Sequence, residues 1–229
     1  MDEPRPGTNG PWKLQVLDDL GEQADRAREM VHAACEALRD RDSDRARSVI
    51  AADPRIDAGA SDLHDRLARL VADTAVSLDD VRFVFAALHA NLHLERVADY
   101  AVTIAKMVRL TEGIPADDLV LHDLQAMGAR VERILVEAMA ALRERDLERA
   151  RGLAALDQEV NQANRMTVLR LLDLGADAML REWGLRMLLV SRCLERIGDH
   201  AVDIGEQVSY MATGAPAEFS DADRSPPGR

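Results

Sequence analysis

The sequence predicts an all-α protein of six long helices, arranged as two tandem, similar three-helix bundles. The chain of 229 residues is 47% hydrophobic, only 3% aromatic, and rich in Ala, Leu, Arg and Glu, which favour helices. Apolar residues recur at helical spacing along most of the chain, and no region alternates like a strand. The third observation is an internal repeat. LERVADYAVTI at 94–104 and LERIGDHAVDI at 194–204 are identical at seven of eleven positions.

A second pair of segments supports the duplication. ALRDRDSDRARSVIAAD at 37–53 matches ALRERDLERARGLAALD at 141–157, and the two pairs occur in the same order in each half. We therefore divide the chain into a first repeat, a second repeat and two tails rich in Pro, Gly and small polar residues that we expect to be disordered. The repeats span 12–112 and 113–212, and the tails span 1–11 and 213–229.

The helices of the first repeat are predicted, in order, at 13–39, 43–74 and 77–110. Asp42 and Ser77 are suitable N-caps for the second and third of these helices, and Gly113 is a suitable stop after the third. Pro54 lies inside the second helix, where it either kinks the helix or marks a new start with Asp53 as its N-cap.

The helices of the second repeat are predicted, in order, at 117–143, 146–173 and 176–212. Asp146 is the expected N-cap of the middle helix, and Gly175 is its expected stop. Long helices joined by short connections fold back antiparallel, so each repeat should form a three-helix bundle. The pattern leaves open whether the two bundles pack side by side or share one core.

Charge and composition exclude several classes of function. The formal net charge of −12 and the scarcity of aromatic residues argue against nucleic-acid binding, which needs a basic footprint and stacking residues. The two cysteines, Cys35 and Cys193, form no CxxC motif and are expected to be thiols in a reducing cytosol. The amino terminus does not resemble a signal peptide, and no apolar stretch approaches 18 residues. We therefore expect a cytoplasmic protein without direct membrane insertion, which could be peripheral to the membrane through protein partners.

The repeated segments combine an apolar stripe with a line of acids. On a helix, with successive residues ~100° apart, the apolar residues of each copy fall on one face and should be buried. These residues are Leu94, Val97, Ala101, Ile104 and Val108 in the first copy, and Leu194, Ile197, Ala201, Ile204 and Val208 in the second. The acids then lie on another face. They are Glu95 and Asp99, followed by Thr103, in the first copy, and Glu195, Asp199 and Asp203, with Glu206 beside them, in the second.

These acids are candidate metal ligands, because carboxylates spaced four residues apart present hard oxygen atoms along one ridge. The preceding helix of each repeat adds a shorter pair, Asp53 and Asp57 in the first and Asp157 and Asn161 in the second. If neighbouring helices present these groups to one another, a multinuclear site on the bundle surface would result. The alternative is a solvated acidic face. Asp53 has a second explanation, as the N-cap before Pro54.

Other residues that could carry chemistry have simpler explanations. Arg96 and Arg196, retained in both copies, are expected to form ion pairs with neighbouring acids rather than to bind an anion. His89 and His93 are one turn apart, but packing is favoured over metal binding, and His200 is expected at the surface or an interface. A single Glu-x-x-His, formed by Glu29 and His32, does not suffice for a di-iron site. No phosphate loop, nucleophile elbow or Cys/His arrangement is present, so we expect no enzyme.

The duplicated ExxxD segment, and the R-D-x-x-x-A-R pattern at 41–47 and 145–151, resemble the PhoU family over about residues 15–212. The resemblance implies a cytoplasmic, all-helical, often dimeric regulator that restrains the phosphate-starvation response. Such proteins act through the phosphate ABC transporter ATPase and a phosphate-sensing histidine kinase. Thr103, Tyr100 and Asn161 depart from the family pattern, so the second ridge is the better metal candidate.

The resemblance also implies surface metal clusters, with iron, zinc, magnesium or manganese as the candidate ions. The ligands it implies are Glu95, Asp99, Glu195, Asp199 and Asp203, with Asp57, Asp157 and Asn161 from the shorter motif. Two alternatives remain, a carboxylate-bridged metalloenzyme on a helical bundle and a metal-free helical adaptor that docks basic partners. The direction in which the acids face separates the regulator from the enzyme.

Overall fold

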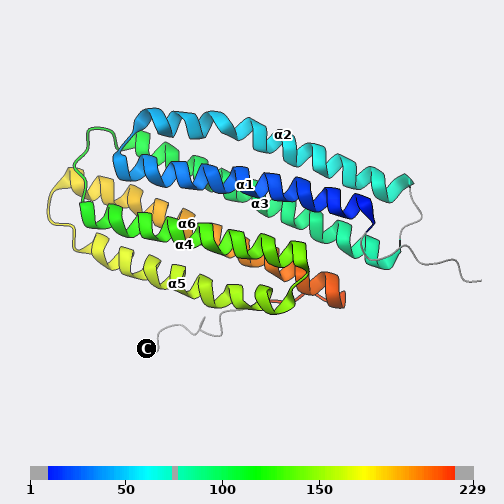
Figure 1. Cartoon of the computed structure of the whole chain (residues 1–229). Coiled ribbons are helices and arrows are strands. Elements are labelled where there is room, and N and C mark those ends of the chain that lie inside the picture. The colour runs from blue at the N-terminus through cyan, green and yellow to red at the C-terminus, as the bar shows by residue number, and fades with distance from the viewer. Residues whose placement is uncertain (1–9, 74–76, 220–229) are drawn as a thin grey trace, which may run out of the picture.

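The computed structural model describes residues 10–73 and 77–219, and within these ranges it is an elongated bundle of six helices (Figure 1). The helices are α1 (Pro11–Asp40), α2 (Ser43–Asp73), α3 (Leu78–Leu110), α4 (Asp118–Glu144), α5 (Leu147–Leu172) and α6 (Ala178–Thr213). Every predicted helix is present with ends within two residues of those expected, and the predicted all-α fold is confirmed.

Side-chain caps fix the starts of the helices as the sequence predicts. The Asp42 carboxylate accepts from the backbone N–H groups of Asp44 and Arg45, both at 2.9 Å. Asp146 accepts from the backbone N–H of Arg149 at 3.0 Å. Ser77 forms a reciprocal capping box with the third residue of α3. These bonds satisfy donors that the first turn of a helix otherwise leaves without partners.

Two equivalent arginines end the first helix of each repeat. Arg41 and Arg145 adopt left-handed backbone angles, with φ of 55° and 54°, at positions where glycine or asparagine is usual. Each side chain then reaches the other repeat. The Arg41 guanidinium donates to the carbonyl of Ile114, and the Arg145 guanidinium lies 5.7 Å from the ring centre of Phe83. The turn that ends the first helix of each repeat is thus attached to the other repeat.

α2 continues as one helix through Pro54, so the alternative of a new helix start is wrong. The buried Oδ1 of Asp53 accepts no hydrogen bond from the described residues, which also removes N-capping as the explanation of this acid. Proline removes one backbone hydrogen bond from the helix. The helix tolerates this loss because its inner face is packed on both sides of Pro54. Val49, Ile56 and Leu63 are all at most 3% exposed.

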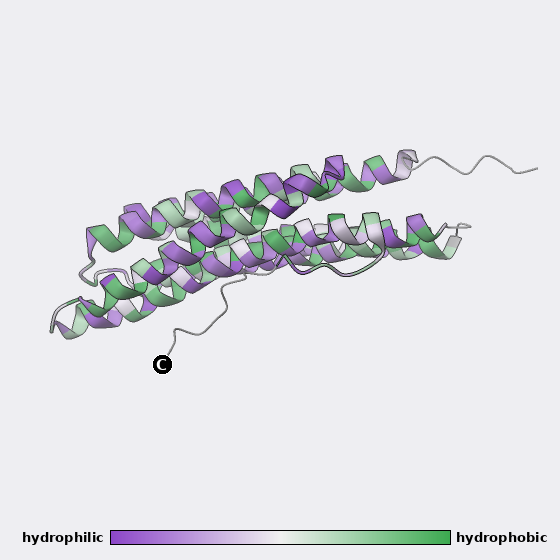
Figure 2. Cartoon of the chain, turned by 90° about the horizontal axis from the view of Figure 1, so that it is seen from below, coloured by the Kyte–Doolittle hydropathy of each residue, from purple (hydrophilic) through white to green (hydrophobic). Residues whose placement is uncertain are grey.

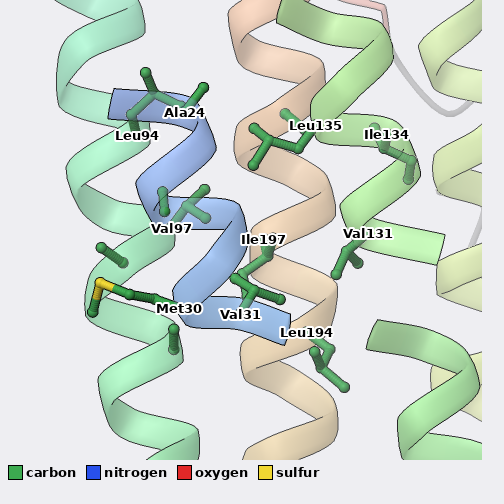
Figure 3. Packing of buried hydrophobic residues seen from close by; sticks show 14 of the residues in the cluster. Ala24, Met30, Val31, Leu94, Val97, Val131, Ile134, Leu135, Leu194 and Ile197 are labelled. Atoms are coloured by element: carbon green, nitrogen blue, oxygen red, sulfur yellow. The ribbon is translucent and has the colours of Figure 1, made fainter. Parts of the chain in front are cut away.

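The two repeats share one continuous apolar core. α1 packs against α4 and α3 against α6, whereas α2 contacts only α1 and α3, and α5 contacts only α4 and α6. Figure 3 shows apolar side chains of α1, α3, α4 and α6 meeting between the repeats, among them Val31, Val97, Val131 and Ile197. α2 and α5 therefore lie on opposite edges of the bundle (Figure 1).

The predicted apolar stripes of α3 and α6 form the centre of this core. Their ten members are each at most 4% exposed. In Figure 2, hydrophobic and hydrophilic residues alternate along each helix, as expected for amphipathic helices. None of the described helices is long and apolar enough to cross a membrane.

The described part of the carboxy-terminal tail folds back against α6. The backbone N–H of Phe219 donates to the Glu206 carboxylate at 2.7 Å, and the Phe219 side chain packs on the core. Residues 1–9 and 220–229, on which most of the two predicted tails fall, lie outside the described residues.

Candidate functional site

The acids of the first repeat gather at the seam between α2 and α3, which we call the first seam. Asp57 of α2 and Glu95 of α3 line the same cleft of about 310 Å³, with His64 beside them. The buried Asn91 side chain of α3 donates to the carbonyl of Ala60 at 2.8 Å and fixes the register of the two helices. Neither Asp57 nor Glu95 has a hydrogen-bond or ion-pair partner among the described residues.

Asp53 adds an uncompensated oxygen to the first seam. Burial raises the pKa of the Asp53 carboxyl above its usual range, and the neighbouring charges of Asp57 and Asp99 raise it further, with Lys106 opposing them. Its Oδ1 is buried without a hydrogen-bond partner among the described residues. Excess negative charge and an orphaned oxygen are features that a bound cation would compensate, so these residues fit a hard metal ion.

Asp99 and Thr103 complete the line of α3. The Arg96 guanidinium lies 3.1 Å from the Asp99 carboxylate. The Thr103 hydroxyl donates to the backbone carbonyl of Asp99 at 3.0 Å, so its hydrogen serves the helix itself. The first seam therefore contains four carboxylates, those of Asp53, Asp57, Glu95 and Asp99, and two cations, the paired Arg96 and Lys106.

The second seam, between α5 and α6, has the same plan with more internal partners. Asp157 is only 8% exposed and packs against Gly198, where an added Cβ would lie 2.5 Å from its Oδ1. Asn161 donates to the Asp157 carboxylate at 2.7 Å. A buried hydrogen bond of 2.6 Å from the Ser191 hydroxyl to the Asn164 side chain fixes the register of these helices.

Arginines neutralise two further acids of the second seam. The Arg192 guanidinium forms an ion pair with Glu195, and Arg196 lies 3.2 Å from the Asp199 carboxylate. The predicted pairing of the two retained arginines with nearby acids is thereby confirmed. Position 92, which corresponds to Arg192, is a leucine, so Glu95 lacks the partner that Glu195 has.

Asp203 lies one turn beyond Asp199 but contacts the other repeat. Its Oδ2 is 3.5 Å from Nδ1 of His93 on α3 and 3.4 Å from Nδ1 of His200, and the two Nδ1 atoms are 3.0 Å apart. Burial lowers the pKa of His93 to about 4, and neighbouring His200 and His89 contribute to the shift while Asp203 opposes it. His93 is therefore neutral at pH 7.

The sequence did not predict this histidine–aspartate cluster. The two histidines lie 107 residues apart, and each alone looks like a packing or interface residue. The signal that could have found them is the antiparallel pairing of α3 with α6, which sets position 93 opposite 200 and position 89 opposite 207. The His89 ring lies 3.2 Å from the Gln207 side chain, as this register requires.

The Glu-x-x-His pair of α1 does not enter the core. The His32 side chain is 57% exposed, and its Nδ1 lies 3.1 Å from the Glu132 carboxylate of α4. A ferritin-like site would need this histidine to point into the bundle.

Known proteins share this architecture and much of the sequence. The family model described as "PhoU domain" matches residues 20–108 and again residues 124–208. A Caulobacter vibrioides protein named phosphate-specific transport system accessory protein PhoU homolog is 33% identical over 180 residues, covering 78% of each chain. A Clostridium acetobutylicum protein of the same name is 27% identical over 209 residues, covering 90% of this chain and 95% of its own.

Two solved structures have the same fold. The crystal structure of PhoU from Pseudomonas aeruginosa superposes with a TM-score of 0.81 at 26% identity, covering 90% of this chain and 99% of that one. The phosphate transport system regulatory protein PhoU from Streptococcus pneumoniae gives a TM-score of 0.82 at 25% identity, covering 90% and 97%.

Proposed function

The chain belongs to the PhoU family, and from this premise we propose that it is a non-enzymatic cytoplasmic regulator of phosphate uptake and phosphate-starvation signalling. It restrains the response by contact with the ATPase of the phosphate ABC transporter and with a phosphate-sensing histidine kinase, and it works as a homodimer. The observation that carries the proposal is the match over both repeats to proteins named as accessory proteins of the phosphate-specific transport system.

We propose further that both seams bind metal ions, with iron, zinc, magnesium and manganese as the candidates. The proposed ligands are Asp57, Glu95 and Asp99 at the first seam, and Asp157, Asn161, Glu195, Asp199 and Asp203 at the second. Such ions would offset the repulsion between the acids and lock the outer helix of each repeat to its neighbour. The orphaned oxygen of Asp53 supports a cation at the first seam.

The contacts favour the first seam as the stronger cation site, whereas the sequence favours the second. Arg192 and Asn161 already supply positive charge and hydrogen bonds to the second seam. The equivalent residues, Leu92 and Asp57, supply neither. A cation arriving at the first seam therefore displaces fewer internal partners of the carboxylates.

The position of the acids favours a regulator over a metalloenzyme. Glu95, Asp99 and Asp199 lie at the seams rather than in the apolar core between the repeats, and the Asp99 side chain is 44% exposed. A carboxylate-bridged oxidase would instead direct its ligands into the bundle interior. A metal-free adaptor remains the second candidate, since the same acidic seams could dock basic partners.

Co-purification from cells grown with and without phosphate tests the proposed partners. We expect the transporter ATPase and the sensor kinase to be retained by the wild-type chain. Charge-neutral variants of each seam, E95Q/D99N and E195Q/D199N, should weaken retention, and D65N, at an exposed acid elsewhere on α2, is the matched control. Retention of neither partner by the wild-type chain would refute contact with them.

Metal analysis of protein purified without chelator tests the metal sites and separates regulator from adaptor. Metal bound by the wild-type chain should fall in the two seam variants. Exchanging the residues at the equivalent positions 92 and 192 then tests which seam binds metal more strongly. L92R should weaken binding at the first seam and R192L should strengthen it at the second, each by about two- to fivefold for a surface ion pair of up to ~1 kcal/mol. A metal-free wild-type chain with intact partner binding would favour the adaptor.

A further inference from the structure

A cluster of three ligating side chains joins the two repeats at the interface of α3 and α6. His93 comes from the first repeat, and His200 and Asp203 come from the second. All three side chains are partly buried, with exposed fractions of 18%, 20% and 40%. The cluster shares Asp203 with the ligands proposed for the second seam, but it differs from both seams in that nitrogen atoms make up two of its three ligand positions.

The distances within this cluster match the edges of a zinc coordination tetrahedron. Zinc binds imidazole nitrogen at about 2.0–2.1 Å and carboxylate oxygen at about 2.0–2.2 Å, so two ligands at a tetrahedral angle lie about 3.3–3.5 Å apart. The three observed separations are 3.0 Å between the nitrogens, 3.5 Å from His93 to Asp203, and 3.4 Å from His200 to Asp203. One ion can therefore reach all three atoms with shifts of a few tenths of an ångström.

A shared proton explains this arrangement less well than a metal ion. One hydrogen on an Nδ1 atom can bridge the two imidazoles, but the accepting nitrogen then has no hydrogen to donate to the Asp203 carboxylate. Protonation of both rings would give each a donor for Asp203 but would place two positive charges 3.0 Å apart. A divalent cation accepts a lone pair from each of the three atoms.

We propose that His93, His200 and Asp203 bind one divalent transition metal ion of the zinc class, which clamps the first repeat to the second. The two imidazoles and one carboxylate are ligands that zinc prefers, and water completes the coordination. The Tyr100 ring stacks on His200 with centres 5.8 Å apart and covers one side of the cluster. The more exposed Asp203 leaves the approach for the ion and the water.

The internal repeat predicts a single such site in each chain. The equivalent positions at the other end of the α3–α6 pairing are Cys193, Tyr100 and Thr103. Only the cysteine among these is a usual zinc ligand, so two of the three ligand positions are lost at that end. The proposed stoichiometry is therefore one ion of the zinc class per chain at this cluster, besides the ions proposed at the two seams.

Zinc titration of the full chain, freed of its purification tag and stripped with chelator, tests the site. We expect one tight equivalent of Zn²⁺, a visible absorption band with Co²⁺, and a higher melting temperature with zinc, because an ion that binds only the folded state stabilises it. H93Q, H200Q and D203N should each weaken zinc binding at least about 100-fold, beyond the 10–100-fold typical of losing an outer-shell partner.

Two controls keep the outcome specific. H122Q removes a histidine whose side chain is 80% exposed, and E95Q/D99N alters the first seam, so both should retain the tight equivalent. D203N replaces an acid with an isosteric amide at the most exposed position, so it remains informative if a histidine variant fails to fold. Undiminished zinc affinity in D203N and H200Q, or loss of the tight equivalent in E95Q/D99N, would overturn the proposal. A wild-type chain that retains no zinc would overturn it too, whatever the co-purification shows.

Discussion

The first and second seams are formed by equivalent pairs of helices, α2 with α3 and α5 with α6, but they differ in what surrounds their acids. In the second seam, Asn161 donates a hydrogen bond to Asp157 and Arg192 forms an ion pair with Glu195, which offsets the repulsion between the carboxylates. The first seam has Asp57 and Leu92 at these positions. Among the described residues, each seam holds a buried carboxylate oxygen that accepts no hydrogen bond, Oδ1 of Asp53 in the first and Oε2 of Glu195 in the second, but only Glu195 has an arginine in an ion pair with that oxygen. Duplication thus kept the backbone plan, while the charge balance of the two seams diverged.

The buried hydrogen bonds that fix the register of the helices also differ between the two repeats. In the first repeat Asn91 on α3 donates to the backbone of Ala60 on α2, whereas in the second Ser191 on α6 donates to Asn164 on α5. The asparagine has moved to the opposite helix, and the bond between the two positions is retained. A conserved geometry can therefore be built with its side-chain roles exchanged, and a motif alone does not say which oxygens remain available.

Cavity-forming substitutions in the shared core should have the largest effects on stability, and these effects should be similar in the two repeats. Phe83 and Trp183 occupy equivalent positions and are 2% and 1% exposed. F83A and W183A should each lower the free energy of unfolding by about 3–5 kcal/mol, because each leaves a large cavity. Urea denaturation followed by circular dichroism measures both. Because the core is continuous, each variant should still unfold in one transition, and a two-step curve in either would contradict a single core.

A smaller effect is expected where the packing of the repeats differs. Gly205 of α6 faces the buried Leu153, and a Cβ at Gly205 would overlap the Cδ1 of that leucine. The first repeat has Ala105 and Val49 instead. G205A should lose up to about 2 kcal/mol of stability, since a steric cost of about 1–3 kcal/mol is offset by a gain of about 1 kcal/mol from replacing a helical glycine.

The double variant G205A/L153V tests the explanation of that loss. It gives the second repeat the residue pair of the first and should recover most of the stability, because valine lacks the overlapping carbon. No recovery in the denaturation midpoint would show that Gly205 is required for another reason.

The smallest effects on stability are expected for substitutions of one acid in each seam. With chelator present, D157N and D53N should change the free energy of unfolding in opposite directions. D157N should cost about 1 kcal/mol, because Asn161 loses a charged acceptor. D53N should gain about 0.5 kcal/mol, since it removes a charge that burial and then the neighbouring Asp57 and Asp99 disfavour.

The pH dependence of the D53N effect follows from the raised pKa of Asp53. The folded state holds this proton more tightly than the unfolded state, so stability is lost as pH rises from the ordinary value of 3.8 through the folded value. D53N should remove that loss, and its advantage should vanish below the ordinary pKa. Thermal melts between pH 3 and 7 measure the difference, and an equal gain at every pH would exclude the charge of Asp53 as the cause.

Most of the fold could be predicted from the sequence because local signals agree with the tertiary structure. The caps at Asp42, Ser77 and Asp146 and the apolar stripes of α3 and α6 each depend on residues close together in the chain. Pro54 was harder to interpret, because the packing that carries α2 through it comes from residues of other helices.

The candidate site was only partly predictable for the same physical reason. The acids could be identified, since their four-residue spacing is local. Their compensation could not, because it depends on which neighbour lies at positions 92 and 161. The pairing of His93 with His200 was missed because it depends on how α3 and α6 are set against each other, which no single helix pattern encodes.

The outer positions of α2 and α5 have a consequence for the motions of the molecule. Each of these helices packs on two helices of its own repeat only, whereas the other four also pack across the repeats. Local opening is least costly where the fewest buried contacts must be broken, so the backbone amides of α2 and α5 should exchange with deuterium sooner than those of α3 and α6. Ions held at the seams would slow this exchange. The rigidity of α2 and α5 would then depend on whether the seams hold ions, and a protein that contacts these helices could distinguish the two states.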